Sequence, residues 1–273
     1  MHGRVLVIAG SDSGGGAGIQ ADIKAITALG GFAMTAVTAL TAQNTLGVQG
    51  VFAVPPDFLR LQIASVLDDL GADVIKTGML GDTATIAAVC AELDARAAGI
   101  PVVVDPVMVA KGGHSLLAEA AVADMKRLLV PRAAVITPNL PEAEVLAGMA
   151  IPDLGAMRVA ATALLGLGVP AVLLKGGHLP GAEVVDILAT PAGLEEFRAP
   201  RIESRHTHGT GCTLASALAA GLAQGMALRE AVLRARAYVR AAMLSAPGYG
   251  AGHGPLDHAV TLDPGRLEAL RSA

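Results

Sequence analysis

The chain has 273 residues and a net charge of −4, with 53% hydrophobic, 16% charged and 2% aromatic residues. This composition excludes intrinsic disorder, and it lacks the basic footprint and stacking aromatics that nucleic-acid binding requires. The two cysteines are far apart, no apolar run reaches about 18 residues, and the first residues show no signal-peptide pattern. We therefore expect a soluble cytoplasmic protein without a disulfide framework or a structural zinc site.

Short apolar runs alternate with segments of helical periodicity along the whole chain. We expect buried strands at residues 5–9, 34–40, 74–77, 102–107, 134–137 and 171–174, and two more at 183–189 and 194–199. Helices are expected between them, among them 19–29, 56–70 and 215–223. The alternation predicts an α/β fold with a mostly parallel central sheet that helices cover on both faces. Because no linker, repeat or low-complexity tract divides the chain, we expect a single domain over residues 1–273.

The first expected strand runs into a glycine-rich loop at residues 10–18, where five of nine residues are glycine. Ligands of parallel sheets bind beyond the carboxyl ends of the strands, and a helix start offers free N–H groups to an anion. The loop matches neither the Walker A sequence nor the dinucleotide fingerprint, so a flexible connection is the alternative interpretation. Asp22, one turn into the following helix, reads by itself as an exposed helical acid.

The next two strand ends carry side chains suited to a flat heterocycle. Gln43 lies in residues 41–45 and can present a donor and an acceptor side by side, as an aminopyrimidine edge requires. An ordinary turn is the simpler explanation of that position. Lys76 either contacts a phosphate or extends its ammonium group out of the sheet into solvent. Met79 offers an adaptable apolar surface to a ring, with a core methionine as the alternative.

Three later strand ends carry charged and amide side chains. Asp105 follows three valines, where a carboxylate is costly unless it is paired or bound to a metal, so it can hold Mg²⁺ or orient a hydroxyl group. Asn139 and Glu142 flank Pro141, which favours a helix start. This amide and carboxylate can hold the waters of Mg²⁺, cap the helix, or do both. Lys175 precedes two glycines, a composition typical of a phosphate contact.

The last loop, residues 207–213, reads THGTGCT and leads into an alanine-rich helix. The first N–H groups of that helix point one way, so this loop is a candidate anion hole for a phosphoryl group in transfer. Cys212 falls in the first turn, where the helix dipole is expected to lower the thiol pKa and suit it as a base or proton relay. A small buried residue is the alternative. The two histidines of this region lack a third ligand, so they support a metal site only weakly.

Taken together, these loops resemble the ribokinase-like superfamily and, more closely, the hydroxymethylpyrimidine/phosphomethylpyrimidine kinases of thiamine biosynthesis. The matching strings occur in the order of the family and span residues 5 to about 258. They are AGSD at 9–12, GGAGIQAD at 15–22, AQNT at 42–45, KTGML at 76–80, DPVM at 105–108, TPNLPE at 137–142, KGGH at 175–178 and THGTGCT at 207–213. Such a set is far more specific than any single glycine loop.

The resemblance implies a three-layer α/β/α sandwich and a kinase that uses ATP and Mg²⁺ and forms a homodimer. Its expected acceptor is 4-amino-5-hydroxymethyl-2-methylpyrimidine, which is converted to the monophosphate and then to the diphosphate. A pyridoxal or pyridoxamine kinase of the same fold is the alternative, because some bacterial members resemble this family and also carry a cysteine. Those enzymes tend to lack the AQNT string, so Gln43 favours the pyrimidine. A nucleotide-binding dehydrogenase and a non-catalytic pyrimidine-binding regulator are weaker alternatives.

Carried over position by position, the resemblance gives roles to the residues of these loops. It implies acceptor binding at Gly10, Asp22, Gln43, Met79 and Asp105. It implies ATP and phosphate contacts at Asn139, Glu142, Lys175 and Thr207, with Mg²⁺ at Asp105 and Glu142, directly or through water. It implies catalysis at Lys175, the anion hole of Gly209, Thr210 and Gly211, and Cys212, which stands where the wider superfamily usually has an aspartate. One departure, Asp12-Ser13-Gly14 in place of Asp-Pro-Ser or Asp-Ser-Ser, is expected to have little effect on substrate choice.

Overall fold

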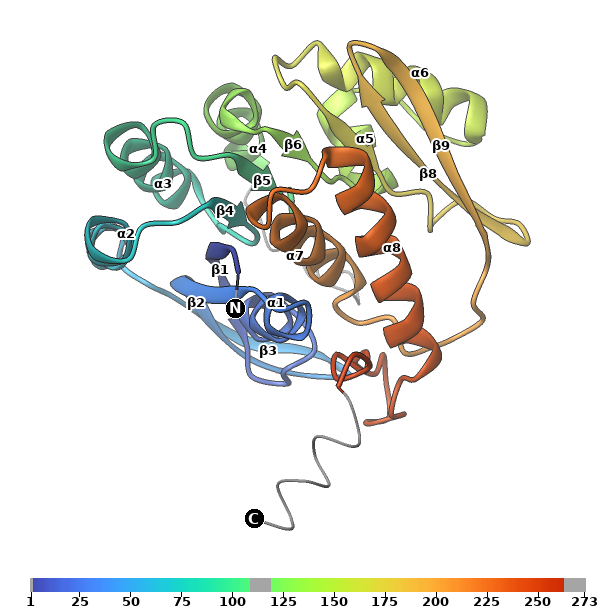
Figure 1. Cartoon of the computed structure of the whole chain (residues 1–273), viewed down its shortest axis with the longest axis horizontal. Coiled ribbons are helices and arrows are strands. Elements are labelled where there is room, and N and C mark those ends of the chain that lie inside the picture. Colours follow the sequence, from blue (N-terminus) through green and yellow to red (C-terminus); the bar gives the residue numbers. More distant parts are fainter. Residues whose placement is uncertain (1, 109–118, 263–273) are drawn as a thin grey trace.

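The computed structural model describes residues 2–108 and 119–262, and its centre is a sheet of nine strands (Figure 1). Their order across the sheet is β3-β2-β1-β4-β5-β6-β7-β8-β9. The strands are β1 (Arg4–Asp12), β2 (Phe32–Asn44), β3 (Gly47–Ala53), β4 (Val74–Thr77), β5 (Val102–Val104), β6 (Val135–Ile136), β7 (Val172–Leu174), β8 (Glu183–Thr190) and β9 (Gly193–Pro200).

The neighbouring strands from β2 to β7 pair in parallel, whereas β3 at one edge and β8 and β9 at the other pair antiparallel. This arrangement confirms the mostly parallel sheet and all eight expected strands. The ninth, β3, is not among them. Its sequence, GVQGVFA, shows no regular alternation of apolar and polar residues, and most of its residues are exposed. Residues 41–44 continue β2 in place of the expected turn, and Gln43 pairs with Val48 of β3.

Helices cover both faces of the sheet, which confirms the three-layer α/β/α sandwich. On one face lie α1 (Gly18–Ala28), α7 (Thr210–Ala223) and α8 (Leu228–Leu244). On the other lie α2 (Pro56–Asp69), α3 (Thr83–Arg96), α4 (Glu119–Asp124), α5 (Leu140–Ala147) and α6 (Leu154–Leu165). A π-helical turn (Met125–Leu129) and a 3₁₀ turn (Val130–Arg132) follow α4.

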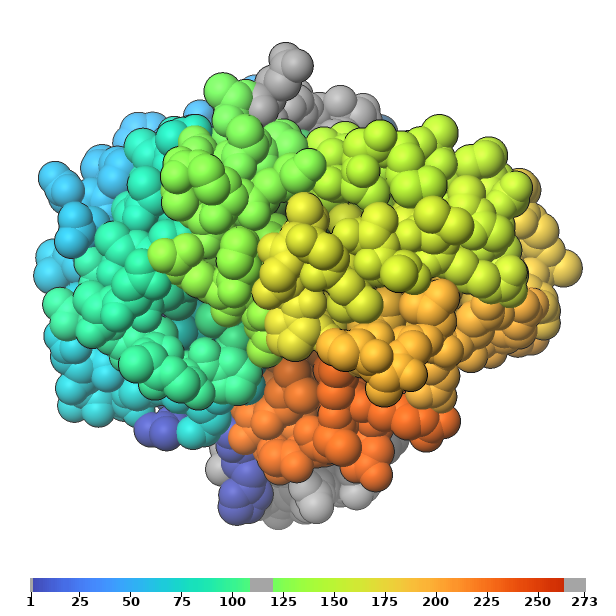
Figure 2. Space-filling model, turned by 90° about the horizontal axis from the view of Figure 1, so that it is seen from above, coloured from blue at the N-terminus to red at the C-terminus, as the bar shows by residue number. Residues whose placement is uncertain are grey.

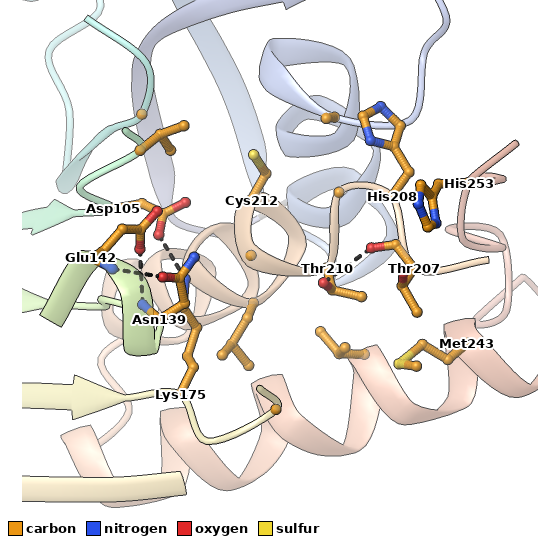
Figure 3. A pocket seen from close by; sticks show the side chains of 18 of the residues that line it. Asp105, Asn139, Glu142, Lys175, Thr207, His208, Thr210, Cys212, Met243 and His253 are labelled. Atoms are coloured by element: carbon orange, nitrogen blue, oxygen red, sulfur yellow. Dashed lines mark hydrogen bonds and ion pairs between the residues drawn. The ribbon is translucent and has the colours of Figure 1, made fainter. Parts of the chain in front are cut away.

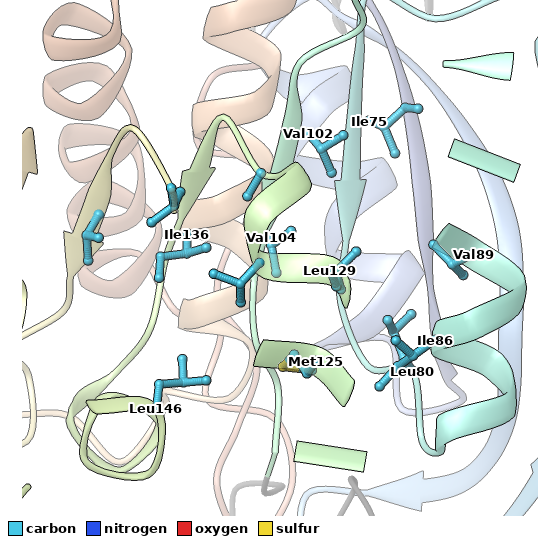
Figure 4. Close-up of a cluster of buried hydrophobic side chains, with 14 of the residues drawn as sticks. Ile75, Leu80, Ile86, Val89, Val102, Val104, Met125, Leu129, Ile136 and Leu146 are labelled. Carbon is cyan, nitrogen blue, oxygen red and sulfur yellow. The ribbon is translucent and has the colours of Figure 1, made fainter. Parts of the chain in front are cut away.

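The strands alternate between the two apolar layers residue by residue. Val5 and Val7 of β1 pack with α1 and α7, whereas Leu6 and Ile8 pack with the layer of α2 and α3. Figure 4 shows the second layer, in which side chains of β4, β5 and β6 meet those of α3 and the turns after α4. Because side chains point alternately to opposite faces of a strand, continuous apolar runs bury both faces.

Seen from above, the molecule shows the cyan and teal segments of α2 and α3 at one side and the orange β9 at the other (Figure 2). The green to yellow segments around α5 and α6 pack between them. Among the described residues, no helix has both the length and the apolar character needed to span a membrane. The carboxyl ends of the parallel strands open toward the start of α7, and that edge positions the candidate site.

Candidate active site

A pocket of about 780 Å³ lies where the carboxyl ends of the parallel strands meet the N-terminus of α7. It contains every residue predicted to bind substrate, phosphate or metal except Asp22. The lining residues among them are Gly10, Gln43, Met79, Asp105, Asn139, Glu142, Lys175, Thr207, Gly209, Thr210, Gly211 and Cys212. The expectation that ligand-facing residues follow the parallel strands thus places these loops around a single cavity.

One side of the pocket holds a buried ion pair between Asp105 and Lys175, whose Nζ and Oδ1 atoms are 3.0 Å apart. Thr137 donates a second hydrogen bond to the same oxygen at 2.9 Å. Burial raises the pKa of Asp105, but the nearby charges of Lys175 and Lys76 outweigh it, so the pKa lies below its ordinary value. The carboxylate is therefore charged, as a paired or metal-bound carboxylate must be.

Asn139 and Glu142 lie beside this pair and cap α5. The Asn139 side chain accepts from the Glu142 backbone N–H at 2.9 Å, and the Glu142 carboxylate accepts from the Asn139 N–H at 2.8 Å. This reciprocal capping box confirms the helix-cap interpretation. Burial raises the Glu142 pKa to about 7, and the charge of Asp105 adds to the effect of burial. Figure 3 shows these residues grouped with Lys175 on one side of Cys212.

Asp22 lies beneath the pocket and is completely buried, so the expectation of an exposed helical acid is wrong. Its two carboxylate oxygens each lie 3.0 Å from Nζ of Lys76, and Ser216 donates to one of them at 2.7 Å. Lys76 is also completely buried although it borders the pocket, so of its two expected roles the extension of the ammonium group into solvent is wrong. The pair follows from packing, because β4 ends between α1 and α7, which supply Asp22 and Ser216.

The N-terminus of α7 has the geometry of an anion hole. Gly209 is its N-cap residue with φ of +83°, and a Cβ there would lie 1.8 Å from the carbonyl oxygen of Gly16. Only glycine fits this position. A Cβ on Gly211 would lie 3.2 Å from Nζ of Lys175, so the lysine approaches the backbone of the first turn. No side chain caps this helix start, whereas Thr210 bonds back to the carbonyl oxygen of Thr207 at 3.1 Å.

Cys212 lies in the first turn of α7 as expected, but the prediction that its thiol pKa is lowered is wrong. Burial raises that pKa to about 12, with the negative charges of Asp22 and Asp105 adding to the rise. The ammonium group of Lys76 lowers the thiol pKa, but by less than burial and the two carboxylates raise it. Desolvation therefore outweighs the helix dipole, and the thiol is neutral before ligands bind.

Two residues that the sequence analysis did not assign, Asp12 and His208, hold the glycine-rich loop together. The Asp12 carboxylate accepts hydrogen bonds from the backbone N–H groups of Gly14, Gly16 and Ala17 at 2.8 to 3.1 Å. It also lies 2.9 Å from Nε2 of His208, the residue before Gly209. Its position just ahead of the glycine run is the available sequence signal, because an aspartate there can fold a loop around itself. Among the described residues, no three His, Cys, Asp or Glu side chains form a metal-ligand cluster.

The far side of the pocket comes from segments that carry no recognisable motif, and it mixes apolar with charged side chains. Val239 and Met243 of α8 and Ile202 after β9 line it, together with His253. Figure 3 shows Met243 and His253 on the other side of Cys212 from Asp105. The pocket therefore extends from the charged cluster around Asp105 to a mixed apolar and basic surface, which includes Arg205 and Arg240.

Comparisons with known proteins agree with this geometry. A family model described as phosphomethylpyrimidine kinase matches residues 12–257. The thiamine biosynthesis bifunctional protein ThiED of Geobacter sulfurreducens is 52% identical over 262 residues, covering 96% of this chain and 53% of that protein. The hydroxymethylpyrimidine/phosphomethylpyrimidine kinase of Bacillus subtilis is 48% identical over 256 residues, covering 93% of this chain and 94% of that protein. The chain thus spans about half the length of the first relative and nearly all of the second.

Among solved structures, the pyridoxal kinase from Staphylococcus aureus in complex with ADP superimposes with a TM-score of 0.88. It is 35% identical, and the match covers 95% of this chain and 94% of that one. This similarity confirms the ribokinase-like architecture expected from the sequence. The identity is lower than that to the two curated relatives, so the sequence stands nearer to them.

Proposed function

The chain belongs to the phosphomethylpyrimidine kinase family, and from this premise we propose the reaction that its pocket performs. It transfers the γ-phosphoryl group of ATP to the hydroxymethyl group of 4-amino-5-hydroxymethyl-2-methylpyrimidine, and then phosphorylates the monophosphate to the diphosphate. The observation that carries the proposal is the convergence of Gln43, the Asp105–Lys175 pair and the open N-terminus of α7 in one pocket. The domain is a single kinase unit over the whole chain and works in the cytoplasm.

The acceptor ring binds between Gly10, Met79 and Gln43. A Cβ on Gly10 would lie 2.7 Å from the Met79 methyl group, so glycine at this position lets the Met79 side chain pack directly against the Gly10 backbone at the pocket wall. The Met79 thioether supplies a polarizable surface for that ring. The Gln43 amide offers the donor and acceptor pair that an aminopyrimidine edge matches. Asp22 acts from beneath the pocket, through its ion pair with Lys76.

The transferred phosphoryl group binds at the first turn of α7. Gly209, Thr210 and Gly211 supply the backbone N–H groups there, although that of Thr210 makes a long 3.4 Å hydrogen bond to the Thr207 carbonyl oxygen in the free protein, and Lys175 lies beside Gly211. Phosphoryl transfer needs positioning and charge stabilisation rather than covalent catalysis, so this combination suffices for the main catalytic task. Thr207 fixes the approach to that turn through its carbonyl oxygen.

Asp105 and Glu142 fit a magnesium site of the kind that keeps most of its waters. The donors are two carboxylates and the nearby Asn139 amide, which are the oxygen ligands that Mg²⁺ prefers. The raised pKa of Glu142, about 7, marks a carboxylate short of positive charge, and a divalent cation would keep it ionised. When bound, Mg²⁺ supplies charge neutralisation of the phosphates.

Cys212 relays the proton of the acceptor hydroxyl group: Sγ takes that proton while its own S–H proton passes to an oxygen of the transferred phosphoryl group. Because its raised pKa keeps the thiol protonated in the free enzyme, Cys212 cannot remove the hydroxyl proton beforehand, and the proton transfer follows most of the bond cleavage to the leaving phosphate. A loose transition state tolerates such late proton transfer.

A pyridoxal kinase is the second candidate, because the pyridoxal kinase of Staphylococcus aureus shares the fold and 35% of the sequence. The test is ADP release with Mg-ATP against the hydroxymethylpyrimidine, its monophosphate and pyridoxal in parallel. Turnover of both pyrimidines with little on pyridoxal supports the proposal. Preference for pyridoxal would replace the substrate assignment, and no turnover with any of the three would leave a nucleotide-binding protein without this activity.

We propose that the homodimer expected from the resemblance forms through the hairpin of β2 and β3. Leu46, Val51 and Phe52 of this hairpin are 72%, 49% and 67% exposed, and Phe58 beside it is 57% exposed. Clustered exposed apolar side chains mark interaction surfaces. Light scattering on the parent chain and on Phe52→Ser tests the proposal, since the variant is expected to shift toward monomer. A monomeric parent would contradict it.

A further inference from the structure

His208 is buried between the glycine-rich loop and the anion hole, and only 8% of it is exposed. Its Nε2 atom lies 2.9 Å from Oδ2 of Asp12. The hydrogen bond from His208 and those from the loop backbone outweigh burial and hold the Asp12 pKa below its ordinary value. An ionised carboxylate only accepts hydrogen bonds, so Nε2 of His208 carries the hydrogen. The ring is held in place because Gly16 packs against it, where a Cβ would lie 2.5 Å from Cδ2.

The Gln43 amide lies between this imidazole and Thr41. Its Nε2 is 3.4 Å from Nε2 of His208, and its Oε1 is 3.2 Å from Oγ1 of Thr41. The Thr41 hydroxyl also lies 2.9 Å from the carbonyl oxygen of Ser11, which can only accept, so its single proton is used there. Thr41 therefore presents an acceptor to the amide. Nε2 of His208 has no lone pair to offer, so the amide can only share the N–H that Asp12 already accepts at 2.9 Å.

Both neighbours require the same amide orientation. As the distances above are given, the amide oxygen faces Thr41 and the amide nitrogen faces His208. Donors and acceptors balance only when the amide is turned from this orientation by about 180° around its Cγ–Cδ bond, so that the carbonyl faces His208 and the NH₂ group faces Thr41. In that orientation one N–H and one lone pair of the carbonyl remain for a ligand. Turning the amide back exchanges this donor and acceptor, and it leaves a donor facing a donor at His208.

We propose that His208 is a specificity-determining positioning residue, whose Nε2–H is shared between Asp12 and the Gln43 carbonyl and thereby fixes the donor–acceptor pattern that the pocket shows to the acceptor ring. The inference rests on the proposed function and deepens it. The ligand feature that this pattern recognises is a ring nitrogen next to an exocyclic amino group. The ring nitrogen accepts from the free N–H of Gln43, and the amino group donates to the Gln43 carbonyl. Because His208 directly precedes Gly209, the same side chain joins ring recognition to the anion hole.

The test compares two acceptors, 4-amino-5-hydroxymethyl-2-methylpyrimidine and the same compound without its amino group. The measured quantity is the ratio of their kcat/KM values. We expect His208→Leu to lower this ratio about tenfold, the worth of one hydrogen bond, by raising KM for the amino compound while KM for ATP stays the same. His208→Gln is the matched control, because its side-chain amide carries an N–H to a similar reach, and it is expected to keep most of the ratio.

An unchanged ratio in a folded His208→Leu variant would overturn the inference, as would an equal loss in His208→Gln. If His208→Leu does not fold, Thr41→Val removes the other anchor of the amide with little change in volume. A lower ratio in that variant supports the inference, and an unchanged ratio overturns it. A parent chain that phosphorylates neither compound would instead contradict the proposed function. Calorimetric binding of the two rings to parent and variants then decides the role of His208 without turnover.

Discussion

Two lysine–carboxylate pairs in this molecule are chemically alike and are expected to act differently. Lys76–Asp22 and Lys175–Asp105 each join an ammonium group to a carboxylate at 3.0 Å. The side chains of the first pair are 0% exposed, whereas Lys175 is 13% exposed and faces the pocket. The first pair is sealed in the cavity floor, where Lys76 borders the pocket without exposed surface and Asp22 lies behind it, and the second forms part of the wall. We infer that the sealed pair governs stability and the open pair governs chemistry.

The difference follows from where each strand ends. Lys76 points into the layer of α1 and α7, whose side chains Asp22 and Ser216 enclose it. Lys175 follows β7, and the first turn of α7 lies close enough that a Cβ on Gly211 would be 3.2 Å from its Nζ. A buried charge without its partner is strongly destabilising, whereas a charge at a wet cavity is solvated in part.

The largest expected effect is on stability, from Lys76→Met. This change leaves the Asp22 carboxylate buried without its counter-ion, so the free energy of unfolding should fall by about 3–5 kcal/mol. The double variant Lys76→Met, Asp22→Leu removes both charges and should recover most of the loss. Urea unfolding of the three proteins measures both effects. A single variant as stable as the parent would contradict a structural role for the sealed pair.

The open pair should respond in turnover. Lys175→Met removes the cation beside the anion hole, and we expect kcat to fall about 10²–10³-fold, as when one stabilising donor of a transition state is lost. Its loss of unfolding free energy should be smaller than that of Lys76→Met, because Asp105 keeps the nearby charge of Lys76 and the hydrogen bond from Thr137. Steady-state kinetics and urea unfolding on the same preparation separate the two pairs. Equal losses of stability in the two lysine variants would remove the distinction.

The succession of strands along the chain and the location of the pocket could be predicted from the sequence, because parallel strands expose their carboxyl ends at one edge. Gln43, Asp105 and Lys175 were identified in this way. The sealed pair could not be predicted, since Asp22 and Lys76 are 54 residues apart and meet only through the packing of α1 against β4. Likewise, the sequence of the glycine run does not show that its backbone N–H groups donate hydrogen bonds to the Asp12 carboxylate.

The next effect concerns the dependence of stability on pH that Glu142 causes beside the open pair. The Glu142 pKa is raised from 4.5 to about 7 by burial, so between these values the folded state keeps a proton that the unfolded state releases. The free energy of unfolding therefore falls as pH rises through this window, by on the order of 3 kcal/mol. Asp105 has a lowered pKa and changes charge below the window, so it does not obscure the effect.

Glu142→Gln tests this expectation, because the amide stays neutral and its oxygen can still accept from the N-cap backbone. Urea unfolding at several pH values should show a shallower decline between about pH 4.5 and 7 in the variant than in the parent. Parallel declines would mean that Glu142 titrates normally. Added Mg²⁺ should also flatten the decline of the parent if the cation binds at this carboxylate.

Cys212 lies between the two pairs and gives the smallest expected effect, because both pairs act on its thiol. Lys76 lowers its pKa while Asp22 and Asp105 raise it, and burial sets the final value at about 12. A general base is most effective when its pKa is near the working pH, so this thiol should contribute at the low end of the usual range. We expect Cys212→Ala to reduce kcat by about a hundredfold and to leave KM for ATP unchanged. Equal losses in turnover and in ATP binding would instead assign Cys212 to the shape of the anion hole, and the thiol would then be a packing group rather than a proton relay.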